Sequence, residues 1–149
     1  MFNENLKLSG QLAIVLRDKD GNVKEERTEK NLVVTTGLNY IASRMKDATA
    51  TAMTHMGLGS GTTAAAAGQT DLVTLLGSRE ALDSTTVTAN AVAYVSSFEA
   101  GDATGAVTEA GIFNAATSGT MLCRVKFDVV NKAADDTMTV TWTITLAAS

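Results

Sequence analysis

The C-terminal part of the chain alternates apolar and polar residues with a period of two. In its last segment, Met138, Val140, Trp142, Ile144 and Leu146 occupy one set of alternate positions, and Thr137, Thr139, Thr141, Thr143 and Thr145 the other. Strict alternation predicts a β-strand with one buried face and one polar face. We therefore expect a strand over 137–146, with Trp142 near the centre of the core.

A second alternating strand is predicted over 120–130. One face, expected toward the core, would carry Met121, Cys123, Val125, Phe127 and Val129. The opposite face, expected toward the solvent, would carry Leu122, Arg124, Lys126 and Asp128. Further strands are predicted over 11–17, 31–35, 53–58, 79–88, 92–98 and 106–113. Residues 23–29 are predicted to form a very polar strand with one solvated face. Residues 18–22 contain Asp20-Gly21, which is typical of a hairpin turn because glycine tolerates positive φ.

One helix is predicted over 37–46, because its apolar residues form a single stripe: Leu38, Ile41, Ala42 and Met45. Thr36 is the expected N-cap. Residues 70–76 predict a helical turn that begins at Thr70 and ends at Gly77. Residues 1–10 carry no strong structural pattern, and we expect them to form a flexible arm.

These elements predict a mainly β protein. Short strands separated by turns, without a strand–helix–strand rhythm, favour an antiparallel β-sandwich, immunoglobulin-like or jelly-roll-like, with one short α-helix. The 149 residues match a single domain over 1–149. A chain of this size buries about 70% of its unfolded surface, so it needs neither a disulfide nor a metal to fold.

Charge and cysteine content narrow the class of partner. The net charge is −4, and no basic cluster is present, so we expect no nucleic-acid binding. A single cysteine excludes an intrachain disulfide and fits assembly in a reducing cytoplasm. The N-terminus lacks a signal-peptide pattern, and the apolar run 12–16 is too short to span a bilayer. We expect a soluble protein that does not contact membranes.

Two loops resemble ligand sites only in part. Asp18, Asp20, Asn22 and Glu29 have partial calcium-loop spacing, but Val23 stands where an EF-hand requires glycine. A solvated hairpin turn is the favoured interpretation. Gly57, Gly59 and Gly61 suggest a phosphate loop, yet no lysine follows to contact a phosphate. A close-packed or interface-forming backbone loop is favoured instead.

Isolated reactive side chains give no catalytic set. His55 is the only histidine, and Cys123 is predicted on a buried face, where a thiol is a poor nucleophile. Glu109 and Asp102 are acidic residues near glycines, but nothing places them across a cleft as a glycosidase requires. Glu109 is better interpreted as a structural hydrogen-bond acceptor at a strand start. We predict no catalytic, cofactor-binding or metal-binding residues, and hence no enzyme.

Several motifs resemble a family of tailed-bacteriophage structural proteins. Residues 55–70 contain a Gly-x-Gly-Thr-Thr loop followed by small residues, and 108–114 read Thr-Glu-Ala-Gly-Ile-Phe-Asn, the most specific block. Residues 31–38, Arg79, 98–101, 121–124 and Phe127 are similar to the family as well. The resemblance covers about residues 31–146.

The resemblance implies a virion component of the decoration or tail-fibre type, without catalytic residues or cofactors. The first expectation is a capsid decoration (cement) protein that is made in the host bacterial cytoplasm, docks on the major capsid protein and forms a homo-oligomer. The second is a tail, collar or baseplate module that anchors or forms part of a fibre. A third hypothesis, a carbohydrate-binding adhesion module, requires an exposed aromatic platform. Trp142 is predicted to face inward, and Tyr40 and Tyr94 do not cluster in the sequence.

Overall fold

A computed structural model describes residues 5–46 and 50–148. Its elements are, in order, β1 (Leu6–Arg17), β2 (Val23–Val33), α1 (Thr35–Arg44), β3 (His55–Gly59), β4 (Glu80–Ala81), β5 (Ser84–Thr88), β6 (Ala91–Phe98), β7 (Gly105–Phe113), β8 (Met121–Lys132) and β9 (Thr137–Ala148). The prediction of a mainly β chain with one short helix is confirmed. No helix among these residues is long and apolar enough to cross a membrane.

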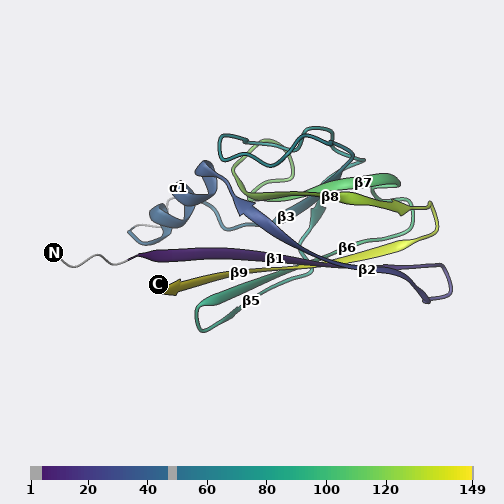
Figure 1. Ribbon diagram of the computed structural model, residues 1–149, viewed down its shortest axis with the longest axis horizontal. Helices are drawn as coiled ribbons and strands as arrows, with labels where there is room; N and C mark the ends of the chain where they lie inside the picture. Colours follow the sequence, from purple (N-terminus) through teal and green to yellow (C-terminus); the bar gives the residue numbers. More distant parts are fainter. Residues whose placement is uncertain (1–4, 47–49, 149) are drawn as a thin grey trace.

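All nine strands form one continuous antiparallel sheet in the order β4-β3-β7-β8-β2-β1-β9-β6-β5. The sheet curls, so that β1, β9 and β5 lie on one side of the molecule and β3, β7 and β8 on the other (Figure 1). Its two terminal strands, β4 and β5, follow one another along the chain. The nine strands form one sheet rather than two separate sheets. The antiparallel β-sandwich, immunoglobulin-like or jelly-roll-like, therefore stays a prediction.

The core lies between the two halves of this curled sheet. Leu12 and Trp142 from one half and Met56 and Ile112 from the other are all fully buried in one apolar cluster. The expected position of Trp142 in the core is thus confirmed. Cross-strand pairing places Trp142 between Leu12 of β1 and Tyr94 of β6, so aromatic and aliphatic side chains stack across three strands.

The N-terminal part of the chain departs from the sequence predictions. Residues 6–10 are not a flexible arm, because they pair with β9 from Ala148 to Ile144; the first four residues of the predicted arm lie outside the described residues. The separate strands predicted over 23–29 and 31–35 are a single strand, β2. It pairs with β1 along most of its length and with β8 only at Leu32 and Val33. One strand therefore links the two halves of the sheet.

The helix begins earlier than predicted. Its N-cap is Val34, which provides no side-chain hydrogen bond, and Thr36 lies inside the first turn. The Thr36 hydroxyl instead donates to the carbonyl oxygen of Met121 at 2.8 Å. A Cβ at Gly37 would lie 2.0 Å from the carbonyl oxygen of Leu122, so the helix backbone packs directly on β8. Tertiary contact, rather than a cap, fixes the start of α1.

Two further predictions about faces and turns were wrong. Residues 70–76 form no helical turn, because the N–H groups of Val73 and Thr74 donate to the carboxylate of Glu109. In β8, the pairing with β7 shifts between Glu109–Lys126 and Val107–Val130. This irregularity turns Val129 outward, 45% exposed, and buries Val130 instead. Leu122 and Arg124, predicted on the solvent face, are also buried.

Candidate functional site

A buried carboxylate lies where the Gly-x-Gly-Thr-Thr loop meets β7. Glu109 on β7 is fully buried, and its Oε1 accepts hydrogen bonds from the N–H groups of Gly61 at 2.9 Å and Thr74 at 2.7 Å. Its Oε2 accepts a third from the N–H of Val73 at 3.0 Å. A single side chain therefore holds both ends of the segment 61–74 against the sheet.

A buried arginine compensates this charge from the neighbouring strand. Arg124 on β8 is fully buried; its Nε donates to Glu109 Oε2 at 2.9 Å, and its Nη2 lies 2.8 Å from the same oxygen. Its Nη1 donates to Gln69 Oε1 at 3.0 Å. Gln69 in turn bonds the backbone of Ala64 and Ala66. Buried charges are tolerated when they are paired and hydrogen-bonded in this way.

The glycines of the Gly-x-Gly-Thr-Thr loop are needed because this carboxylate lies against them. A Cβ at Gly59 or at Gly61 would lie 2.5 Å from Glu109 Oε1. The Thr108 hydroxyl donates to the Gly61 carbonyl at 2.8 Å and fixes the loop from its other side. The loop is therefore close-packed, as the sequence favoured, and the N–H group of Gly61 donates to the carboxylate of Glu109.

A second arginine, Arg79, holds the turn between β7 and β8. The guanidinium of Arg79 lies 3.5 Å from the centre of the Phe113 ring, a cation–π contact. Its Nη1 donates to the carbonyl oxygens of Ala115 at 2.9 Å and Ser118 at 2.7 Å. Nη2 donates to Asp71 at 3.2 Å. Arg79 thus fastens the β7–β8 turn to the segment before β4.

The interpretation of Glu109 as a structural acceptor agrees with these contacts, although Glu109 lies within β7 rather than at its start. Sequence reasoning missed Arg124 as the partner of Glu109, and it missed the contacts that Arg79 makes with Asp71 and the β7–β8 turn. For Arg124 the only indication was an arginine in the middle of an otherwise regular strand, which the alternation placed on the solvent face. Together these side chains hold the surrounding loops in place.

The candidate calcium loop is a self-contained turn. Asp18 Oδ1 accepts the N–H groups of Asp20 and Asn22, both at 2.9 Å, and Gly21 has a positive φ of 84°. Glu29 does not join this turn; its Oε1 lies 4.0 Å from Arg27 Nη1. Among the residues described, no three acidic, histidine or cysteine side chains gather as a metal site would require.

The remaining reactive candidates are dispersed. His55 Nδ1 lies 2.8 Å from the Thr54 hydroxyl at the start of β3. Cys123 is fully buried, and this burial raises the pKa of its thiol well above the ordinary value. Asp102 accepts the N–H of Glu99 at 3.1 Å in the turn after β6. His55 and Asp102 therefore make local hydrogen bonds, and Cys123 is enclosed in the core.

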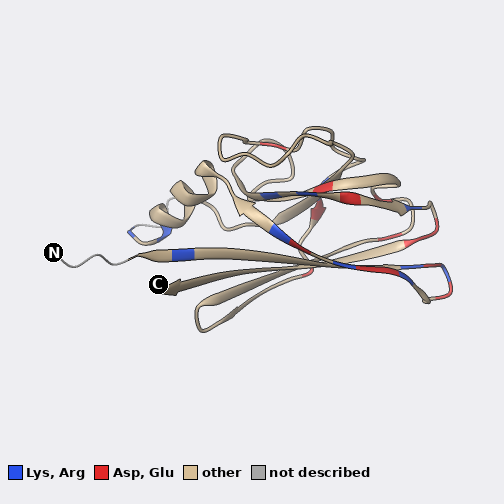
Figure 2. Ribbon diagram, in the orientation of Figure 1, with Lys and Arg blue, Asp and Glu red and all other residues tan. Residues whose placement is uncertain are grey.

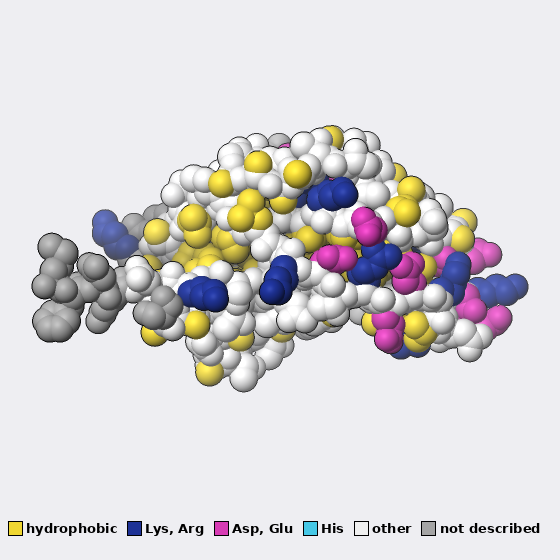
Figure 3. Space-filling model, viewed as in Figure 1, with side chains coloured by type: hydrophobic (Ala, Val, Ile, Leu, Met, Phe, Trp, Pro, Cys, Tyr) yellow, Lys and Arg dark blue, Asp and Glu magenta, His cyan; other side chains and the backbone are white. Residues whose placement is uncertain are grey.

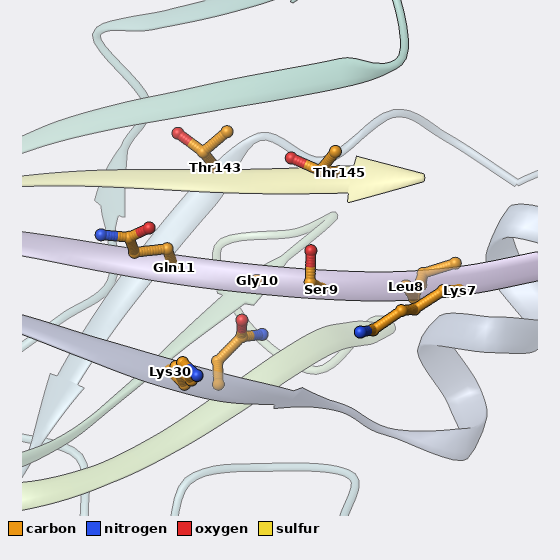
Figure 4. A pocket seen from close by; sticks show the side chains of 9 residues that line it. Lys7, Leu8, Ser9, Gly10, Gln11, Lys30, Thr143 and Thr145 are labelled. Atoms are coloured by element: carbon orange, nitrogen blue, oxygen red, sulfur yellow. The ribbon is translucent and has the colours of Figure 1, made fainter. Parts of the chain in front are cut away.

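A polar hollow of about 420 Å³ lies on the outward surface of β1, β2 and β9. Figure 4 shows Ser9, Thr143 and Thr145 pointing to the same side of the sheet, with Lys7 and Lys30 at its border. The lining offers hydroxyls, amides and two ammonium groups, but no carboxylate. Such a surface can form hydrogen bonds to a partner, but it offers no acid–base pair.

An apolar groove of about 320 Å³ opens between α1 and the β5–β6 hairpin. Tyr40 and Tyr94, distant in the sequence, both line it, together with Val87 at its rim. Burial, and then the nearby Tyr40, raise the pKa of Tyr94 to about 12. The described aromatic side chains are buried or half-buried, so they provide no exposed platform of the kind that the carbohydrate-binding hypothesis requires.

Charge is distributed unevenly over the molecule. Figure 2 shows the β5–β6 hairpin without a charged residue, and Figure 3 shows charged side chains gathered around the β1–β2 hairpin. Between Lys7 and Arg17 at the two ends of β1, the outward side chains of β1, β9 and β6 form an uncharged surface, here called the threonine face: Ser9, Gln11, Ala13, Val15, Thr139, Thr141, Thr143, Thr145, Ala91, Ala93, Val95 and Ser97. Depletion of charge is typical of the centre of a protein–protein interface.

No family model, no curated protein and no solved structure matches this chain.

Proposed function

We propose that this chain is a non-enzymatic structural component of a tailed phage particle, and specifically a capsid decoration protein that docks on the outer shell. The observation that carries the proposal is the use of the motif residues. Glu109, Arg124 and Arg79 all bond to loop backbone or to one another within the fold. Their hydrogen bonds and ion pair hold the loops in a fixed shape. A module that binds by surface complementarity requires such a fixed shape.

The threonine face is the surface that we expect to meet the shell. Thr141 lies near its centre, paired with Ala13 of β1 and Val95 of β6. Small uncharged side chains on the surface of a sheet can approach a second protein surface closely without leaving unpaired charges behind. The threonine hydroxyls supply donors and acceptors for the hydrogen bonds of such an interface.

Location on the particle is tested first. Mass spectrometry of separated heads and tails from a phage that encodes this chain should find it in tail-less heads, in hundreds of copies per particle. Its absence from heads, or a few copies restricted to the tail, would overturn the decoration role and support the tail, collar or baseplate alternative. Complete absence from the particle would overturn the structural proposal as a whole.

The docking face is tested separately by adding purified protein to heads that lack it. Thr141→Lys places a charge in the centre of the threonine face, whereas Thr62→Lys places the same charge on the exposed loop after Gly61. We expect only Thr141→Lys to weaken binding to heads, by about tenfold or more, since like or unpaired charge at an interface costs several kcal/mol. Equal binding by both variants would show that another face docks.

A further inference from the structure

The free edge of β5 is unusual within this sheet. Within the described residues β5 pairs with β6 alone, it is the terminal strand of the sheet, and all five of its residues are exposed. The whole hairpin from position 84 to position 98 contains no charged residue. An exposed edge presents unpaired N–H and C=O groups that can bind another strand.

Two other edges of the sheet are blocked in ways that proteins use against strand addition. The opposite terminal strand, β4, is only two residues long and includes Glu80. Residues 23–31 of β2 have β1 as their only strand neighbour among the described residues, and they carry a run of charged side chains that includes Lys24, Glu25 and Arg27. Short length and charge therefore protect these edges, whereas β5 has neither form of protection.

We propose that β5 pairs in antiparallel fashion with β5 of a second copy of this chain, about a two-fold axis at Thr86. This pairing would be the contact through which the protein self-associates. Its biological purpose rests on the structural role proposed above. The pairing places Thr86 opposite Thr86 on the outward face. Thr85 then lies opposite Val87 on the groove side.

A second copy fits this edge better than a charged partner because the edge is self-complementary. The two-fold arrangement sets no like charges against each other, and a partner strand with charges would find no opposite charge on 84–88. Two-fold pairs are also the commonest form of self-association, since one patch serves both subunits.

The apolar groove supports the same arrangement. Val87 is 70% exposed at the rim of the groove, and its cross-strand neighbour in β6 is Val92, which also lines it. Pairing of the two β5 strands would bring both grooves side by side on one face and cover Val87 with the partner's Thr85. A five-residue strand is only about 17 Å long, so the interface belongs to the small, weak class.

Charge variants at the two-fold axis test the pairing on the purified protein. Sedimentation velocity should show that the wild-type chain dimerises as its concentration rises. Thr86→Lys and Thr86→Asp should each weaken the dimer by about tenfold or more, since like charges then face each other. An equimolar mixture of the two variants should recover the dimer, because unlike charges now meet. The control Thr63→Lys, on an exposed loop, should dimerise like the wild type.

A cysteine at the same position tests the register. Facing residues of antiparallel strands have Cα atoms about 4.5–5.5 Å apart, within the range of a disulfide. Because Cys123 is fully buried, Thr86→Cys introduces the one accessible thiol of the described chain. Mild oxidation should link most of Thr86→Cys into dimers but little of Thr63→Cys.

Three outcomes would overturn the inference: a wild-type chain that stays monomeric at high concentration, a dimer that Thr86→Lys leaves unchanged, or equal cross-linking of both cysteine variants. These results do not depend on whether the chain is found in a phage particle. Failure of the β5 contact can thus be distinguished from failure of the proposed structural role.

Discussion

Glu109 and Arg124 form an ion pair, 2.8 Å between Oε2 and Nη2, in which both side chains are fully buried. Such a pair contributes little when it is compared with apolar residues of the same shape, but removing one partner leaves a buried charge uncompensated. We expect Arg124→Met to lower the free energy of unfolding by about 3–5 kcal/mol. Glu109→Gln should have a similar cost, because the amide presents a donor to the N–H groups and the guanidinium.

The double variant Glu109→Gln/Arg124→Met separates pairing from packing. It should lose clearly less stability than the sum of the single changes, with a coupling of about 1–3 kcal/mol in urea unfolding followed by circular dichroism. Glu25→Gln, which disrupts the partly exposed pair with Arg27, is the control and should cost less than about 1 kcal/mol. Additive effects at Glu109 and Arg124 would contradict the account of the pair.

The loop that Glu109 holds should tolerate a methyl group at one glycine and not at another. A Cβ at Gly61 would lie 2.5 Å from both Glu109 Oε1 and Val73 Cβ, whereas a Cβ at Gly68 has no neighbour within 4 Å. Gly61→Ala should therefore lower the unfolding free energy by about 1–3 kcal/mol through overpacking. Gly68→Ala should be neutral or stabilise slightly, since it restricts the unfolded chain. Thermal unfolding of the two variants compares them directly.

The fold was predictable from the sequence where one periodic pattern determined it. The alternation in β9 located Trp142 in the core, and the mainly β class followed from the spacing of strands and turns. Prediction failed where a distant contact overrode the local pattern. Residues 70–76 resemble a helical turn, but their N–H groups bind Glu109, which is more than thirty positions away.

The faces of β8 show a second reason why prediction from the sequence failed. Alternation implies one buried and one exposed face, yet Leu122 and Arg124 are buried together with Met121 and Cys123. Helix α1 and the loop 61–74 cover the face that the pattern assigned to solvent. No local feature of the sequence of β8 indicates that these segments pack on it. The register shift that exchanges Val129 and Val130 likewise arises from pairing with β7.

Gly10 and Asn31 face each other across β1 and β2, and a Cβ at Gly10 would lie 1.5 Å from Asn31 Oδ1. We expect Gly10→Ala to lower stability by about 1–3 kcal/mol, because the amide must move. Asn31→Ala removes the obstacle, so Gly10→Ala/Asn31→Ala should be closer to the wild type than Gly10→Ala alone, with a coupling of about 1 kcal/mol in urea unfolding. If Asn31→Ala leaves the cost of Gly10→Ala unchanged, the proposed clash is not its cause.

Tyr94 should make the protein sensitive to alkali. Its pKa is raised from 10.0 to about 12 in the folded chain, chiefly by burial, so the folded state disfavours the phenolate. The unfolded chain ionises first, so stability that is fully present below pH 10 should decrease as the pH rises from about 10 to about 12, by about 2.7 kcal/mol at most, since each pKa unit corresponds to about 1.36 kcal/mol. Urea midpoints across this range should show the loss in the wild type and a shallower slope in Tyr94→Phe. Tyr40→Phe leaves the Tyr94 hydroxyl and its burial, the larger cause of the shift, in place and should keep most of the wild-type slope. An undiminished slope in Tyr94→Phe would assign the alkaline loss to other groups.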